Sequence, residues 1–336
     1  MFQYSKDMLT PQNIRQIANN YKSSIALAVA IKLDVFSAIE AGATTAEEVA
    51  SNVNAAAIGI ERLLNALTFM KLLSKDNEKF SNTEEASLFL VKGRPGYQGG
   101  YVKYTSDILS NWLNLEDAIS DGSLKVEGID EILGGNEEKT KSFIAAMNTN
   151  AMPNAKFVSE TVDFTNDKRI LDMGGGAATY SIAVAKKYPN IQATVVDLTP
   201  IANLAREYVN EAGLSNRVEV VDGDYSKDTW GDGYDSVFLF AVIHQEVPST
   251  TLKMFKKARA CLNDGGKLIL STFVLDDSKT SPPFSVMFGL ELLVVTKNGY
   301  VYTAKEIIDL LSQAGFASSK IVDNSTGPAT FIIATK

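Results

Sequence analysis

The only histidine in the 336 residues is His244, in a chain with twelve tyrosines and sixteen phenylalanines. It follows an apolar run in "FAVIHQEVPS", residues 240–249. Imidazole is the side chain whose ordinary pKa lies near neutrality, so it can take up a proton during a reaction. A histidine packed at a strand end with both nitrogens satisfied is the competing interpretation. The rest of the chain must decide between the two.

A glycine-rich segment, "ILDMGGGAATY" at residues 170–180, lies between an expected strand and an expected helix. Residues without a Cβ let a ligand lie directly against the backbone at such a turn. Gly174 and Gly176 supply the first two glycines of a dinucleotide-binding fingerprint, but Thr179 stands where the third belongs. Alone, this motif is a weak indication.

Acidic residues end the next two expected strands. Asp197 comes about twenty residues after the glycines, where a carboxylate accepts hydrogen bonds from both ribose hydroxyls. Asp224 follows the third strand and can accept from an adenine amino group, with Tyr225 against the ring. Each acid alone also fits a helix cap or a solvated turn. The ordered set predicts an adenosine site.

The elements that position these residues alternate between strand and helix after residue 155. We expect strands at 168–174, 191–198, 217–224, 234–243 and 265–274. This alternation predicts an α/β fold with a parallel sheet covered by helices on both faces. Residues 318–336 contain two strand-like runs around a turn at 325–328, which predicts a terminal hairpin with one antiparallel strand.

Before residue 155 the periodicity is mostly helical, with a buried helix expected at 23–39 and Thr45 capping the next helix through Glu48. Three helices and a short polar strand give a winged-helix pattern. A ligand-sensing transcription factor is therefore a second hypothesis, although the third helix carries only Arg62 and Lys71 for phosphate contacts. The apolar helix at 23–39 favours burial against a partner subunit.

Composition excludes several classes of protein. The net charge of −8 argues against a general nucleic-acid binder. One cysteine, Cys261, suits a reducing cytoplasm, and we find neither a signal peptide nor a membrane span. With one histidine and one cysteine, no metal site is expected. No P-loop and no G-x-S-x-G turn occurs.

Both NAD and S-adenosylmethionine contain adenosine, so Asp197 does not separate them. The reversed last strand does, because it resembles the sheet of methyltransferases rather than that of dehydrogenases.

The chain resembles the S-adenosylmethionine-dependent O-methyltransferases that act on phenols and polyketides, the family of the plant caffeic acid and isoflavone enzymes and many bacterial relatives. Residues 26–50 and 60–84 resemble its dimerising winged-helix domain, and residues 143–164 resemble its linking helix. The segments "ILDMGGG", "VVDL", "GDY", "IHQEV", "LNDGGKLIL" and "YTAKEIIDLLSQAGF" follow in the family's order. The resemblance implies a class I methyltransferase, Rossmann-like domain at 156–336 after a dimerisation domain and linking helices at 1–155.

The same resemblance assigns residues to the cofactor and to catalysis. His244 matches the catalytic base. The positions that match the cofactor contacts are Gly174, Gly176, Asp197, Leu198, Asp224 and Tyr225. In such enzymes the sulfonium makes the methyl group electrophilic, so the protein must align an acceptor and remove its proton. The expected partners are a small-molecule acceptor and a second copy of the chain, with no nucleic acid or membrane.

The sequence departs from the family around this base. Gln245 and Glu246 replace the usual aspartate and tryptophan, and Thr272 and Val301 stand where plant members have two glutamates. An imidazole without a carboxylate partner is a weaker base. The acceptor is therefore an acidic hydroxyl, or a carbon or nitrogen nucleophile, unless the chain is a non-methylating relative.

Five further residues fall in segments that line the acceptor pocket in relatives. Glu291 is the only charge in "SVMFGLELLVV", residues 285–295, and is a candidate to bind or deprotonate the acceptor. The other candidates are Trp112, Phe143, Met147 and Met287. Aromatic and methionine side chains are as common in plain core.

Overall fold

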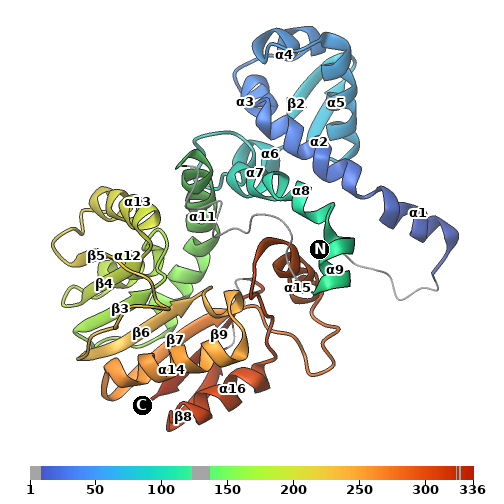
Figure 1. Cartoon of the computed structure of the whole chain (residues 1–336). Coiled ribbons are helices and arrows are strands. Elements are labelled where there is room, and N and C mark those ends of the chain that lie inside the picture. Colours follow the sequence, from blue (N-terminus) through green and yellow to red (C-terminus); the bar gives the residue numbers. More distant parts are fainter. Residues whose placement is uncertain (1–8, 123–136, 323, 325–326) are drawn as a thin grey trace. The chain divides into compact units, whose positions relative to one another are not determined.

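The computed structural model describes residues 9–122, 137–322, 324 and 327–336 (Figure 1). The chain divides into two compact units, Met1–Leu109 and Ser110–Lys336. The boundary expected at residue 155 falls inside the long helix α11 (Glu137–Thr161), which belongs to the second unit.

The first unit is mostly helical and carries one small sheet. Its helices are α1 (Pro11–Asn19), α2 (Tyr21–Lys32), α3 (Val35–Glu40), α4 (Ala46–Asn52), α5 (Ala57–Phe69), α6 (Glu84–Phe89) and α7 (Gly99–Asp107). Strands β1 (Leu73–Asp76) and β2 (Lys79–Asn82) pair as an antiparallel hairpin directly after α5. The predicted pattern of helices followed by a small β wing is confirmed.

Local sequence explains both the success and the failure of the helix predictions here. The Thr45 hydroxyl accepts from the Glu48 N–H, and the Glu48 carboxylate accepts from the Thr45 N–H at 3.0 Å, so the predicted cap is confirmed. The single buried helix expected at 23–39 was wrong. Asp34 adopts a left-handed φ of 60° and separates α2 from α3, while Ile25 and Val29 remain exposed.

The second unit is built on a seven-stranded sheet in the order β5-β4-β3-β6-β7-β9-β8 (Figure 1). The strands are β3 (Arg169–Met173), β4 (Gln192–Asp197), β5 (Val218–Asp222), β6 (Tyr234–Phe240), β7 (Leu262–Thr272), β8 (Ser318–Val322) and β9 (Thr330–Thr335). Strands β3 to β7 are parallel, and β9 runs antiparallel to both β7 and β8. The predicted reversed strand is confirmed, whereas Ser325 and Thr326 of its expected turn lie outside the described residues.

Alternating side chains of the strands build a core on each face of this sheet. Leu171 and Val237 face helices α14 (Pro248–Cys261) and α16 (Ala304–Gln313). Their neighbours Ile170 and Phe238 face α11 and α12 (Thr179–Lys187). The remaining elements are α8 (Leu109–Trp112), α9 (Leu115–Asp121), α13 (Thr199–Glu211), η1 (Ile243–Gln245) and α15 (Pro283–Val295). Because successive side chains of each strand are buried on opposite faces of the sheet, the strands appear in the sequence as near-continuous apolar runs.

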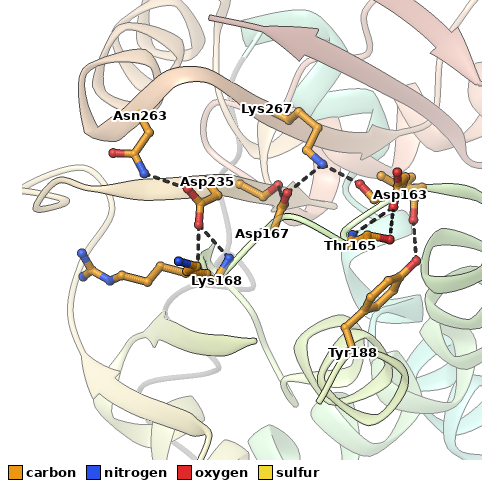
Figure 2. Close-up of polar contacts among 11 residues, drawn as sticks. Asp163, Thr165, Asp167, Lys168, Tyr188, Asp235, Asn263 and Lys267 are labelled. Atoms are coloured by element: carbon orange, nitrogen blue, oxygen red, sulfur yellow. Dashed lines mark hydrogen bonds and ion pairs between the residues drawn. The ribbon is translucent and has the colours of Figure 1, made fainter. Parts of the chain in front are cut away.

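Polar side chains fasten the amino edge of the sheet (Figure 2). The Asp235 carboxylate accepts from the N–H groups of Lys168 and Arg169 at 2.7 and 3.0 Å, and Lys267 Nζ lies 3.1 Å from Asp167 Oδ1. Asp167, Asp235 and Lys267 border a cavity of about 300 Å³ that is also lined by Asn263. These carboxylates therefore hold together the segments at the amino ends of β3, β6 and β7.

Candidate active site

The glycine turn follows β3 at the carboxyl edge of the sheet. Gly174 and Gly176 have φ of 71° and 56°, and the Gly174 N–H donates to the Val196 carbonyl at 2.8 Å. A Cβ at Gly174 would lie 2.8 Å from the Val242 side chain, whereas a Cβ at Gly176 would meet nothing within 4 Å. The turn is therefore closely packed at its first glycine and open at its third, as a ligand against the backbone requires.

Asp197 ends β4 beside this turn. Its carboxylate accepts from the N–H groups of Gly176 and Leu198, each at 2.8 Å. Burial raises the pKa of Asp197, and these two hydrogen bonds partly oppose that effect. The structure thus brings together three of the predicted cofactor residues, with Leu198 44% exposed. A carboxylate has lone pairs left for ribose hydroxyls after two such bonds.

Sequence reasoning missed Asp172, in β3 two residues before Gly174. Its side chain is buried, Oδ2 accepts from the Ser181 hydroxyl at 2.7 Å, and Oδ1 has no hydrogen-bond partner. Burial, opposed by the Ser181 hydrogen bond and reinforced by the charge of Asp197, raises the pKa of Asp172 to about 7. The signal was a carboxyl group inside an apolar strand. An orphaned acidic oxygen beside an open turn fits a bound group that brings donors or positive charge.

The loop after β5 carries Asp224 and Tyr225. Asp224 Oδ1 accepts from the Ser226 N–H at 2.8 Å, and Oδ2 lies 2.7 Å from Lys227 Nζ. Partial burial acts to raise the pKa of Asp224, but Lys227 and Ser226 outweigh it and lower the pKa to about 2. The Tyr225 hydroxyl donates to Glu246 Oε1 at 3.0 Å. This hydrogen bond joins the Asp224 loop to the loop that holds His244.

His244 lies in η1, immediately after β6. Its side chain is 8% exposed, and its carbonyl accepts from the Tyr300 N–H at 3.0 Å. Nδ1 lies 3.4 Å from the Thr272 hydroxyl. Burial lowers the pKa of His244 to about 4. The imidazole is therefore neutral at pH 7, the protonation state that a proton acceptor needs.

Two phenylalanines contact this ring and a third packs against both of them, and sequence reasoning missed all three. Phe288 meets the His244 ring edge-on with centroids 5.0 Å apart, and Phe273 stacks at 6.1 Å. Phe284 packs edge-on against Phe273 at 4.7 Å. The available signals were the position of Phe273 directly after Thr272 and the spacing of Phe284 and Phe288 on one face of α15. We call these three residues the aromatic cluster.

Comparison with known families decides what this site belongs to. The model of the O-methyltransferase domain matches residues 112–317, and that of the O-methyltransferase dimerisation domain matches residues 15–92. The chain belongs to the O-methyltransferase family. It is an S-adenosylmethionine-dependent O-methyltransferase. This assignment favours the enzyme over the second hypothesis, a ligand-sensing transcription factor.

Individual relatives of this O-methyltransferase agree with the family model. The chain is 29% identical to 3-hydroxy-5-methyl-1-naphthoate 3-O-methyltransferase from Streptomyces sahachiroi. The alignment covers 96% of this chain and 94% of that relative. It is 25% identical, over 94% of both chains, to the N,N-dimethyltransferase OxyT from Streptomyces rimosus. The solved structure of PigF with SAH has a TM-score of 0.91 at 25% identity and covers 98% of this chain and 100% of that one.

The predicted acceptor residues of the O-methyltransferase are more scattered. Phe143 on α11 packs against the small cluster of Ile144, Ala177 and Ile201, and Ala177 directly follows the glycine turn. Met287, on α15, is 47% exposed. Met147 on α11, Trp112 at the end of α8 and Glu291 on α15 are half-buried. None of these five predicted residues makes a ring contact or hydrogen bond with His244.

Three other findings concern the site and the described part of the chain. The two positions where plant members have glutamates, Thr272 and Val301, are both buried. Because neither side chain has a carboxylate, no acid reaches the histidine from these positions. Within residues 9–122 and 137–322 no group of three or more histidine, cysteine or acidic side chains is arranged to hold a metal ion. In the same part of the chain no helix is both long and apolar enough to cross a bilayer.

Proposed function

We propose that this O-methyltransferase methylates a hydroxyl group of a small aromatic or polyketide-like acceptor, and that His244 takes the acceptor's proton. The observation that carries the proposal is a buried imidazole beside the aromatic cluster, immediately after the strand next to the one that leads into the glycine turn. One relative is named for methylating a hydroxynaphthoate, which is a planar aromatic compound. This similarity supports a planar acceptor for the present enzyme.

The division of labour follows from the residues. S-adenosylmethionine supplies a methyl group already activated by the sulfonium. We propose that Gly174, Gly176, Asp197 and Leu198 hold its sugar end, while Asp224 and Tyr225 meet the adenine. The orphaned oxygen of Asp172 fits a cofactor with donor groups. Edge-to-face contacts with the aromatic cluster orient a flat acceptor toward His244.

Proton removal is the step that needs His244. A phenol with a pKa of about 10 is only ~0.1% ionised at neutral pH. A base within hydrogen-bond reach typically contributes 10²- to 10⁴-fold in rate. The residues proposed for the walls of the acceptor pocket are Trp112, Phe143, Met147, Met287 and Glu291.

A transfer assay with labelled methyl groups tests the proposal against phenols, hydroxynaphthoates, quinones and polyketides. Label in a methoxy product is the expected result. Label on nitrogen would favour the alternative suggested by the N,N-dimethyltransferase relative, and label on carbon would make the enzyme a C-methyltransferase. Cofactor binding without transfer to any acceptor would place the chain among non-methylating relatives.

Two further proposals concern the molecule in the cell. The match to a dimerisation domain supports a homodimer. A reducing cytoplasm suits the single thiol, Cys261, which is buried and not disulfide-bonded.

A further inference from the structure

The His244 ring has one hydrogen-bond partner among the described residues, the Thr272 hydroxyl. Its other neighbours, Phe273 and Phe288, are apolar. Within the described part of the chain Nε2 has no hydrogen-bond partner, and it is not one of the fully buried polar atoms there that lack a partner. Nε2 is therefore the ring nitrogen that is open to an acceptor, and Nδ1 is the nitrogen that the protein holds.

We propose that Thr272 is the positioning residue of His244: its hydroxyl oxygen accepts the Nδ1 proton, which leaves the Nε2 lone pair facing the acceptor. This inference rests on the proposed function. The 3.4 Å separation is long for a hydrogen bond, and such catalytic contacts tighten when the acceptor is bound. A partner on one nitrogen fixes the tautomer and the orientation of the ring.

A hydroxyl fixes the tautomer without supplying negative charge. A carboxylate in the same place would also stabilise the imidazolium that forms. None of the ionisable groups in the surrounding segments is hydrogen-bonded to the His244 ring, whose partner in the described residues is the Thr272 hydroxyl. Glu246 accepts from Tyr225, the Lys279–Glu306 pair lies beyond Tyr300, and Glu291 is on α15. Burial alone lowers the pKa of His244.

The consequence is selectivity for acidic hydroxyl groups. As the new carbon–oxygen bond forms and the sulfur–methyl bond breaks, the acceptor proton passes to Nε2, and this transfer is easier when the hydroxyl is acidic. An enolised 1,3-dicarbonyl or a hydroxyl conjugated to a quinone carbonyl is such an acceptor. A simple phenol should react more slowly, because a weak base removes the proton of a hydroxyl with a pKa of about 10 less effectively.

The tautomer can be read directly, because the native chain has one histidine. In untagged protein with ¹⁵N-labelled histidine, the imidazole resonances belong to His244 alone. We expect the Nδ1–H tautomer in wild type and in Thr272→Ser, and loss of its dominance in Thr272→Val, which keeps the shape without the hydroxyl. A dominant Nε2–H form in wild type, or an unchanged spectrum in Thr272→Val, would overturn the inference.

Kinetics test the consequence for the acceptor. Across acceptors of rising hydroxyl pKa, we expect wild-type kcat to fall while KM changes little. Thr272→Val should lower kcat about tenfold, Thr272→Ser should restore most of it, and Thr272→Glu should gain activity on simple phenols. Equal rates across the series would overturn the selectivity. No transfer by wild type to any acceptor would instead overturn the proposed function, while the NMR result would still judge Thr272.

Discussion

At His244 the proposed chemistry depends on one side chain, so its removal separates catalysis from binding. We expect His244→Gln to lower turnover at least tenfold, within the 10²- to 10⁴-fold range of a general base, and to leave cofactor affinity nearly unchanged. Turnover is measured with the labelled methyl group and affinity by calorimetry with the demethylated cofactor. Gln245→Ala is the matched control, because it changes the adjacent residue of η1. Unchanged turnover would mean that alignment alone drives the transfer.

Ionisation of Asp172 should make the free energy of unfolding depend on pH. Its pKa is raised to about 7 in the fold, above the ordinary value of about 3.9, so the folded protein holds a proton between these values that the unfolded chain has released. The free energy of unfolding therefore loses this contribution as the pH rises from about 4 to about 7.

The asparagine of the Asp172→Asn variant cannot ionise, so its free energy of unfolding should not fall in this way as the pH rises. Between about pH 5 and pH 8, wild type should lose on the order of 2 kcal/mol relative to the variant in urea titrations without cofactor. His244 has the opposite slope below pH 6.5, but it is common to both proteins and cancels in the difference. Parallel stability curves would show that Asp172 is ionised throughout.

At the scale of elements, Lys257 on α14 holds the loop that carries Asp224 and Tyr225. Its Nζ donates to the carbonyls of Tyr225, Ser226 and Asp228 at 3.1, 3.2 and 3.0 Å. Lys257→Met keeps the aliphatic length but frees these carbonyls. We expect a several-fold weaker affinity for the demethylated cofactor by calorimetry. The neighbouring Lys256→Met should bind like wild type, because Lys256 is exposed, and equal losses in both variants would reject the role of the loop.

Element patterns explain which parts of the fold and site the sequence could predict. Strands buried on both faces and glycine-to-acid spacings are local, so the parallel sheet, the reversed β9 and the Gly176–Asp197 contact could be anticipated. The break at Asp34 depends on one residue entering left-handed backbone inside an apolar run. The aromatic cluster joins β7 to α15 through tertiary packing, which no short-range period records.

At the scale of the whole molecule, the proposed homodimer needs a surface, and the first unit offers an apolar one. Along α1 and α2 the exposed side chains Ile14, Ile17, Tyr21, Ile25 and Val29 recur at intervals of three or four residues, 39% to 56% exposed. That spacing aligns them along one side of a helix. They lie in or next to residues 15–92, the match to the dimerisation domain. A row of this kind is costly to leave in water.

A charge in this row should therefore separate the subunits. We expect Ile25→Glu to shift the mass measured by light scattering from dimer to monomer, because a carboxylate would be desolvated in the interface. Ser23→Glu adds the same charge on the other side of α2 and should remain dimeric. Circular dichroism must show both variants folded, since Ile25 is already 39% exposed and contributes little to the core of its own subunit. A dimeric Ile25→Glu protein would place the interface elsewhere on the chain.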